Sequence, residues 1–93
     1  MQPDAQDRLP RTVWCTGIQA EALVPVLHER IFQDRIWGQQ DHDDRKWLAI
    51  LMEEVGELAK DMLEGRDTYD ELVQVAAVAI AWIEAQERRP HNV

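Results

Sequence analysis

The sequence has 93 residues, enough for one small domain that buries only a modest core by itself. Its formal net charge of −8 at pH 7 repels the phosphates of nucleic acids and anionic lipids, which argues against nucleic-acid polymers and membranes as partners. Cys15 is the single cysteine, so no internal disulfide can form, and no N-terminal apolar stretch resembles a signal peptide. We therefore expect a soluble, cytoplasmic protein, which can still bind a phosphate compound through a metal ion.

The ends of the chain differ in composition from its middle. Residues 1–12 are polar, contain Pro3 and Pro10 and show no periodicity, which predicts a flexible tail. Residues 13–88 form the predicted helical domain, and residues 89–93 form a second flexible tail.

A first helix is predicted over residues 20–36, where apolar side chains recur at helical spacing between Val24 and Ile31. Pro25 fits better near a helix start than inside a helix, so a start near Val24 remains an alternative. Gly38 provides the residue that commonly closes a helix.

The central helix is predicted over residues 47–62, after a polar loop in which Asp41 or Asp43 can act as N-cap. One face of this helix is apolar and the opposite face is acidic. The apolar face carries Leu48, Leu51, Met52, Val55, Leu58, Ala59 and Met62, and the acidic face carries Glu53, Glu54, Glu57 and Asp61. A solvated acidic face explains this pattern. However, Trp47 lies near the acidic side, and Gly56 in mid-helix suggests close approach of a neighbour or ligand. Half-buried carboxylates must be neutralised, which a divalent cation does directly.

The last helix is predicted over residues 69–88, following a glycine stop signal at Gly65. Thr68 and Glu71 have the spacing of a capping box. Residues 72–83 are apolar nearly all the way round, and a helix of this kind is buried on every side. Three helices can hardly enclose it, so the predicted fold is an all-α bundle of about three helices per chain, completed by oligomerisation as a dimer or a dimer of dimers.

Polar residues at the start of the last helix can complete a cation site. Glu71 and Gln74 share one face, and Asp70 points in a similar direction. If the last two helices pack antiparallel, these side chains lie near Glu54 and Glu57, giving oxygen ligands of the kind that Mg²⁺ or Mn²⁺ prefers. Capping alone would also explain Glu71, and a satisfied amide at the edge of the core would explain Gln74.

The segment EEVGELAK at residues 53–60, followed by ELVQVAA at residues 71–77, resembles the EExxE…ExxD pattern of MazG-like nucleotide pyrophosphohydrolases, members of the all-α NTP pyrophosphatase superfamily. The resemblance extends from about Arg30 to Glu84. It includes Gln33-Asp34, Trp37-Gly38 and His42.

This resemblance implies Mg²⁺-dependent hydrolysis of (deoxy)nucleoside triphosphates to the monophosphate and pyrophosphate. Glu54, Glu57 and Glu71 match the positions that hold the metal, and Glu53 matches an outer ligand or water activator. Gln74 stands where the pattern has Asp. An amide oxygen can still ligate Mg²⁺, but the site loses one charge, for which Asp70 could compensate.

Substrate-binding residues follow from the same resemblance. Trp37 and His42 match a loop that lines the nucleotide pocket in relatives, and Trp47 is a rival for stacking on the base. Each tryptophan is equally explained as an anchor to the core. Lys60 could reach a phosphate, although pairing with an acid on its own helix explains it as well.

Two other functions compete with this interpretation. The first is a non-catalytic helical oligomerisation module that retains the acidic residues. The second is a di-iron carboxylate bundle, which is disfavoured because no histidine lies three residues after a glutamate.

Overall fold

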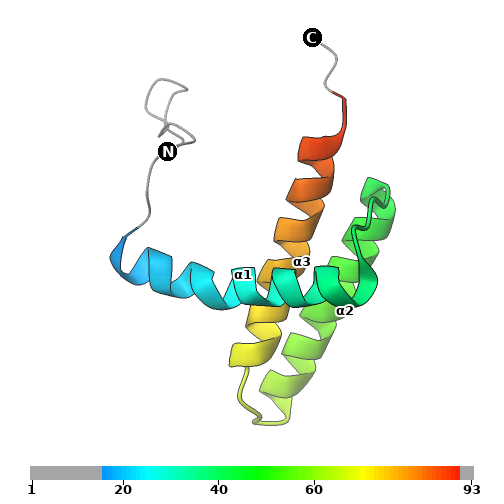
Figure 1. Cartoon of the computed structure of the whole chain (residues 1–93). Coiled ribbons are helices and arrows are strands. Elements are labelled where there is room, and N and C mark those ends of the chain that lie inside the picture. The colour runs from blue at the N-terminus through cyan, green and yellow to red at the C-terminus, as the bar shows by residue number, and fades with distance from the viewer. Residues whose placement is uncertain (1–15, 91–93) are drawn as a thin grey trace, which may run out of the picture.

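A computed structural model describes residues 16–90 of the chain; the predicted N-terminal tail and residues 91–93 lie outside this range. The described part consists of three α-helices: α1 (Gly17–Trp37), α2 (Asp44–Leu63) and α3 (Tyr69–Arg88) (Figure 1). Residues 16–90 contain no strand, and the predicted all-α fold is confirmed. None of the described helices is both long enough and apolar enough to cross a membrane.

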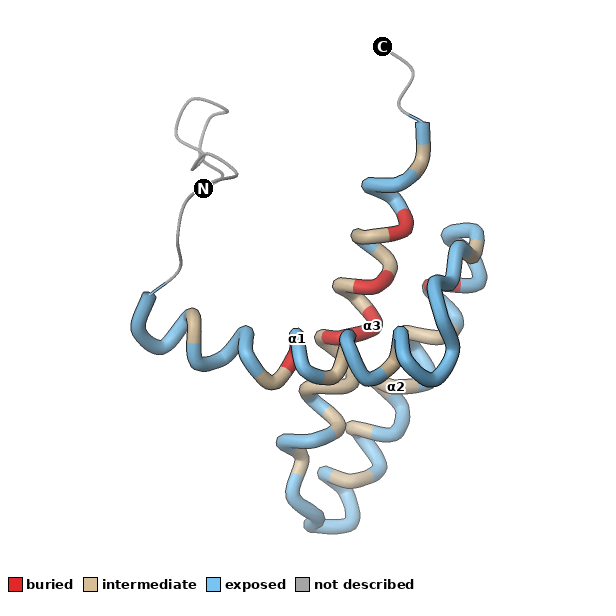
Figure 2. The backbone as a smooth tube through the Cα atoms, in the orientation of Figure 1, coloured by how far each residue is buried: buried red, intermediate tan, exposed pale blue. Residues whose placement is uncertain are grey.

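Helix α3 is the central element of the fold. α2 and α3 form an antiparallel hairpin through the short connection 64–68, and α1 crosses this hairpin at a steep angle (Figure 1). α3 packs against both other helices, and its buried residues form the red stripe along α3 in Figure 2. The core cluster consists of Trp47, Val78, Ala81 and Ala85. Alanines on α3 let the helices approach closely, so a thin core suffices to fix the hairpin.

Helix α1 begins earlier than either start considered from the sequence. It begins at Gly17 and continues through Pro25, so the alternative start near Val24 is wrong. Proline removes one intrahelical hydrogen bond, but the next residue, Val26, is buried, and tertiary packing can override local propensity. At the other end Gly38, with φ of 70°, donates its N–H to the Asp34 carbonyl at 2.8 Å.

The caps of α2 and α3 differ from each other. The Asp43 carboxylate accepts a hydrogen bond from the Lys46 N–H at 2.9 Å, which confirms one of the two predicted caps of α2. The predicted capping box of α3 is wrong. Thr68 has helical backbone angles (φ −100°, ψ −2°) and makes no side-chain cap. The Asp67 carboxylate instead accepts from the Tyr69 N–H at 3.0 Å, and Glu71 is therefore not used as a cap.

The start of α2 and the end of α3 are tied together by polar contacts. The Asp44 carboxylate accepts from Trp82 Nε1 at 2.9 Å and pairs with Arg89 at 2.9 Å, while Asp41 pairs with Arg88 at 2.8 Å. The hydrogen bond from Trp82, followed by those from Arg89 and Gln86, lowers the pKa of Asp44. Arg89, the first residue of the predicted C-terminal tail, thus belongs to the folded unit.

Many apolar side chains remain exposed on the described helices. They include Leu23, Val24, Leu27, Ile31, Phe32, Leu48, Met52, Met62, Leu63, Leu72 and Ile83, each more than 40% exposed. Ala77, by contrast, is fully buried at 0% exposure. Apart from its own helix and chain neighbours, no atom of residues 16–90 lies within 4 Å of the position that a Cβ on Gly56 would take, so the described helices do not make the close approach predicted there. The long apolar segment of α3 is therefore only partly covered by α1 and α2.

Candidate metal and nucleotide site

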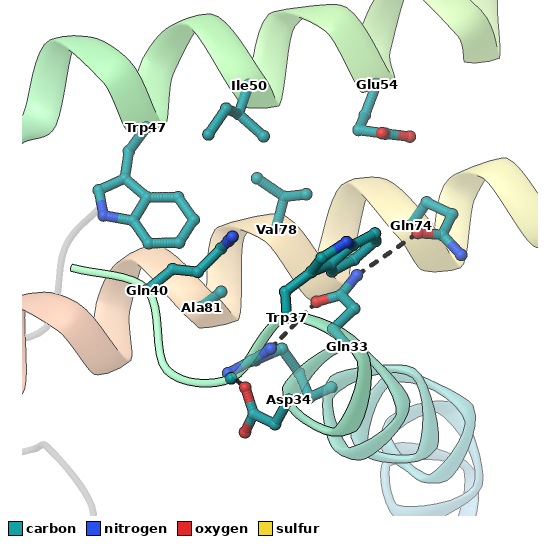
Figure 3. Close-up of a pocket in the computed structure, with 12 residues that line it drawn as sticks. Gln33, Asp34, Trp37, Gln40, Trp47, Ile50, Glu54, Gln74, Val78 and Ala81 are labelled. Atoms are coloured by element: carbon teal, nitrogen blue, oxygen red, sulfur yellow. Dashed lines mark hydrogen bonds and ion pairs between the residues drawn. The ribbon is translucent and has the colours of Figure 1, made fainter. Parts of the chain in front are cut away.

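A pocket of about 220 Å³ lies where α1 crosses the α2–α3 hairpin (Figure 3). Its wall is polar along α1 and mostly apolar along α2 and α3. The lining residues are Arg30, Gln33, Asp34, Trp37, Gly38 and Gln40 from α1 and the loop after it, Trp47, Ile50 and Glu54 from α2, and Gln74, Val78 and Ala81 from α3. The pocket thus lies between all three helices, as expected for a binding site in a small bundle.

Glu54, which lines this pocket, and Glu71, which is not part of its lining, bring two carboxyl groups together. Glu54 is half-buried in the pocket wall, and its pKa is raised, first by burial and then by the neighbouring Glu71 carboxyl. The charges of Glu57 and Glu53 add to this effect. The Glu71 Oε2 atom is buried and has no hydrogen-bond partner. A hydrogen bond between the two carboxyls is part of this shift, because a neutral Glu54 can donate to Glu71. When both acids are ionised they repel each other and the buried Glu71 Oε2 has no donor, and a cation between them would relieve this.

The carboxylate ligands present would suit a Mg²⁺ ion that keeps several of its waters better than one enclosed entirely by protein ligands. Mg²⁺ usually keeps several waters and takes one or two carboxylates together with substrate phosphates. Among residues 16–90, no three Glu, Asp, His or Cys side chains lie together as a ready set of metal ligands. Among the predicted ligands, Glu54 and Glu71 have their carboxyl groups together. Glu57 is exposed and lies about one helical turn after Glu54, and its charge contributes to the raised pKa of Glu54. Glu53 is exposed as well.

Gln74 lies at the pocket, but its amide is turned towards α1. Its Nε2 donates to Glu29 Oε1 at 2.6 Å. Its Oε1 accepts a long hydrogen bond from Gln33 Nε2 at 3.5 Å (Figure 3). Both polar atoms of the amide are therefore engaged by α1 rather than by the acidic pair. Asp70, the residue expected to compensate, is exposed and does not line the pocket.

The predicted substrate-binding residues are placed in different surroundings. Trp37 lines the pocket and is 61% exposed, so its ring is available to a ligand (Figure 3). Trp47 also lines the pocket, but it is only 3% exposed and belongs to the core cluster. His42 packs edge-on against Trp47 with ring centroids 4.9 Å apart and does not line the pocket. Lys60 is exposed and lies outside the pocket lining.

On the polar side of α1, the sequence allowed at most a phosphate contact for Arg30 and gave Gln33 and Asp34 no role. Arg30 is 11% exposed and forms a two-pronged pair with Glu84, with distances of 2.7 and 3.0 Å. The same guanidinium donates to Gln33 and Asp34, both at 3.0 Å. Helical spacing already places Arg30 and Gln33 on the face of α1 that carries Trp37, and this is the signal that could have found these two polar residues. The partner Glu84 depends on how α1 crosses α3.

Comparisons with known proteins identify no relative: no protein-family model, no curated protein and no solved structure matches this chain.

Proposed function

We propose that the protein is a Mg²⁺-dependent pyrophosphohydrolase that converts (deoxy)nucleoside triphosphates to the monophosphate and pyrophosphate, with Mn²⁺ as an alternative metal. The observation that carries this proposal is the Glu54–Glu71 pair, with its buried, unpartnered oxygen, at the edge of a pocket that offers an exposed tryptophan. The resemblance of residues 53–60 and 71–77 to the MazG-like pattern supports the choice of reaction.

Each residue of the site has a distinct part in this proposal. A bound Mg²⁺ would neutralise phosphate charge and make water a better nucleophile. Glu54 and Glu71 would hold the cation, and the neighbouring Glu57 would complete its coordination when a substrate is bound. Glu53, exposed one position before Glu54, would accept the proton of the attacking water.

The nucleotide itself would be held by the pocket. Trp37 would stack on the base, which contributes about 1–3 kcal/mol with little base selectivity. Trp47 would form the rigid apolar floor rather than a stacking partner, because its ring is already packed in the core. The donors of Arg30 are used by Glu84, Gln33 and Asp34, so this residue would shape the pocket rather than bind phosphate.

Self-association is part of the proposal. The apolar side chains exposed on α1 and α2 form faces that a lone small domain rarely leaves in water. We propose a dimer, or a dimer of dimers, in which these faces cover one another. A cytoplasmic location would suit a protein that acts on dissolved nucleotides.

A non-catalytic oligomerisation module is the second candidate. It is favoured by the Gln74 amide, which is held by α1, and by the exposed positions of Glu53 and Glu57. Such a module would keep the acidic pair without turnover.

The experiment that separates the two candidates is incubation of the purified protein with the eight common ribo- and deoxyribonucleoside triphosphates, with Mg²⁺ or Mn²⁺. Pyrophosphate and the monophosphate are detected directly. The proposal expects metal-dependent formation of both products in equal amounts from at least one nucleotide. Release of single phosphate, or no metal-dependent product from any of them, would rule it out.

A further inference from the structure

Three glutamine side chains line the pocket, and they differ in how their amides are used. Gln33 accepts from Arg30 Nη1 at 3.0 Å and donates to Gln74 Oε1 at 3.5 Å. Gln74 in turn donates to Glu29 Oε1 at 2.6 Å. The amide of Gln40, by contrast, forms no hydrogen bond with any other residue that the structure describes. Among these three amides, that of Gln40 is therefore the one free to bind a ligand.

Gln40 lies in the segment 38–43, which joins α1 to α2. Figure 3 shows its side chain reaching from this loop towards the pocket, beside the ring of Trp47. The exposed ring of Trp37 offers a face on which a base can stack, and a stacked base keeps the donors and acceptors of its edge free. Because an amide carries both a donor and an acceptor, Gln40 has the groups needed to bind such an edge.

The loop that carries Gln40 is held by the end of α3. Arg88 Nη2 donates to the backbone carbonyl of Gln40 at 3.3 Å, and Arg88 Nε donates to the Asp41 carboxylate at 2.9 Å. Arg89 donates to the backbone carbonyl of His42 at 3.1 Å. These contacts join consecutive loop residues to the end of α3, so the backbone of Gln40 is held in place while its side chain stays free.

We propose that Gln40 binds the base of a nucleotide, and that Arg88 is the positioning residue that holds Gln40 at the pocket. The ligand is a nucleobase stacked on Trp37, with a donor and an acceptor side by side on the edge that meets the amide. Holding the loop in advance lowers the cost of ordering it when the ligand binds. This inference rests on the part of the proposed function that places the base in this pocket, and it does not depend on the cation site.

The first test is Gln40→Met, which keeps the length of the side chain and removes both polar atoms of the amide. Adenosine, guanosine, cytidine and uridine are each titrated into the full chain in a chelating buffer, and binding is followed by NMR. We expect at least one nucleoside to bind the wild type and to shift the side-chain amide signal that is absent from Gln40→Met. The variant should bind this nucleoside about fivefold more weakly, the equivalent of one net hydrogen bond.

The matched control for this substitution is Gln19→Met. Gln19 is exposed on α1 and does not line the pocket, so the control should bind the nucleoside as the wild type does.

The second test asks whether Arg88 acts through Gln40. Arg88→Gln removes the charge that meets Asp41, and we expect it to weaken nucleoside binding about threefold, as for the loss of a partly exposed ion pair. Arg88→Lys keeps that pair and should recover part of the loss. In the Gln40→Met background, Arg88→Gln should cause no further loss, because a positioning residue acts through the residue that it holds. A purely structural role would weaken binding equally in both backgrounds.

The outcomes separate this inference from the proposed reaction. A folded Gln40→Met variant that binds like the wild type would overturn the role of Gln40, and additive losses in the double variant would overturn that of Arg88. If no nucleoside binds the wild type, the inference is refuted. Because these titrations contain no metal, the cation site is tested separately by metal-dependent pyrophosphate release. Nucleoside binding through Gln40 without such release would support the inference and refute the proposed reaction.

Discussion

At the scale of single residues, the molecule holds carboxyl groups in two opposite electrostatic situations. Asp44 accepts from Trp82 and Arg89 at the surface, and these donors favour its charged form. Glu54 is half-buried beside Glu71, and this setting favours its neutral form. Asp44, an acid of the first kind, has a structural role because it joins the start of α2 to the end of α3. The second kind is typical of sites that bind cations or move protons.

The raised pKa of Glu54 predicts how stability depends on pH in metal-free protein. Because the folded pKa lies above the ordinary value of 4.5, the stability that comes from neutral Glu54 is complete below about pH 4.5. It is lost as the pH rises through the folded pKa. Glu54→Gln keeps the shape of the side chain and cannot ionise. We therefore expect the melting temperature of the wild type to fall relative to Glu54→Gln as the pH is raised from 4 to 7, measured by circular dichroism in a chelating buffer.

The acids with a lowered pKa affect the stability of the protein in a different pH range from Glu54. The contribution of Asp44 is present above its ordinary pKa of 3.8 and is lost only as the pH falls through the lower folded value. If the difference in melting temperature between wild type and Glu54→Gln stayed constant between pH 4 and 7, the pKa of Glu54 would not be raised in the folded protein.

At the scale of helices, α1 is attached to α3 by polar contacts more than by apolar area, and the pair of Arg30 with Glu84 is the charged contact among them. Val26 is its only buried residue, while the Arg30 guanidinium meets both oxygens of Glu84. Charge-assisted hydrogen bonds of this two-pronged kind are stronger than neutral ones.

Arg30→Gln tests this attachment. Losing hydrogen bonds to a charged partner that stays behind costs about 1.5–3 kcal/mol, and the half-exposed Glu84 places the expected loss at the lower end, near 1.5 kcal/mol. The matched control is Arg35→Gln, because the Arg35 side chain lies on the same helix and is exposed. This substitution should change the free energy of unfolding by no more than about 0.5 kcal/mol. Urea unfolding of both variants gives the comparison, and equal losses would contradict the assigned role of Arg30.

The helix starts offer a second comparison within one molecule. Asp43→Ala removes a side-chain cap and should lower the free energy of unfolding by about 1 kcal/mol. Thr68→Ala, at the corresponding position of α3, removes no cap and should change it by less than about 0.5 kcal/mol. Chemical denaturation measures both. A cost for Thr68→Ala as large as that for Asp43→Ala would restore the capping box predicted from the sequence.

Most of the fold could be predicted from local signals. The extent of α3 could be predicted from the stop signal at Gly65 and the long apolar segment, and its start at Tyr69 was predicted correctly although the capping box used to place it does not form. The start of α1 could not be predicted, because the effect of Pro25 is local while the burial of Val26 against the rest of the chain is not. The cap of α3 was predicted wrongly because the spacing of Thr68 and Glu71 does not reveal the helical backbone angles of Thr68.

The site could be predicted only in part for the same reason. Antiparallel packing of the last two helices was enough to bring Glu54 and Glu71 together. The contact between Glu29 and Gln74 joins residues on α1 and α3, and its geometry depends on the angle at which these helices cross. The spacing of residues within one helix does not determine the angle at which two helices cross, so this contact could not be predicted from the sequence.

At the scale of the whole molecule, both α1 and α2 leave large apolar side chains exposed. Leu27 and Ile31 on α1, and Leu48 and Met52 on α2, are each at least half exposed. We expect the wild type to sediment with a mass that is a multiple of 10.8 kDa. A stable 10.8 kDa monomer at micromolar concentration would contradict the proposed self-association.

Self-association is best tested by substitutions at exposed positions rather than at buried ones. Ala77 and Val78 are buried within one chain, so a charge at either would unfold the monomer and say nothing about an interface. Leu27→Glu and Met52→Glu place the charge on exposed sites that the isolated fold tolerates. We expect at least one of them to reduce the mass in sedimentation velocity while helix content is retained, and Glu21→Gln, at an exposed acid on α1, serves as the control.

The central claim is that the Glu54–Glu71 pair is the cation site of a nucleotide pyrophosphohydrolase. The most direct measurement is pyrophosphate release from the best nucleotide by wild type, Glu54→Gln, Glu71→Gln and the control Glu21→Gln, across a Mg²⁺ titration and with helix content checked for each. We expect turnover to fall at least about 100-fold in both site variants, the size of losing a directly acting catalytic group, and to stay unchanged in the control. Near-normal turnover in folded Glu54→Gln or Glu71→Gln would contradict the account.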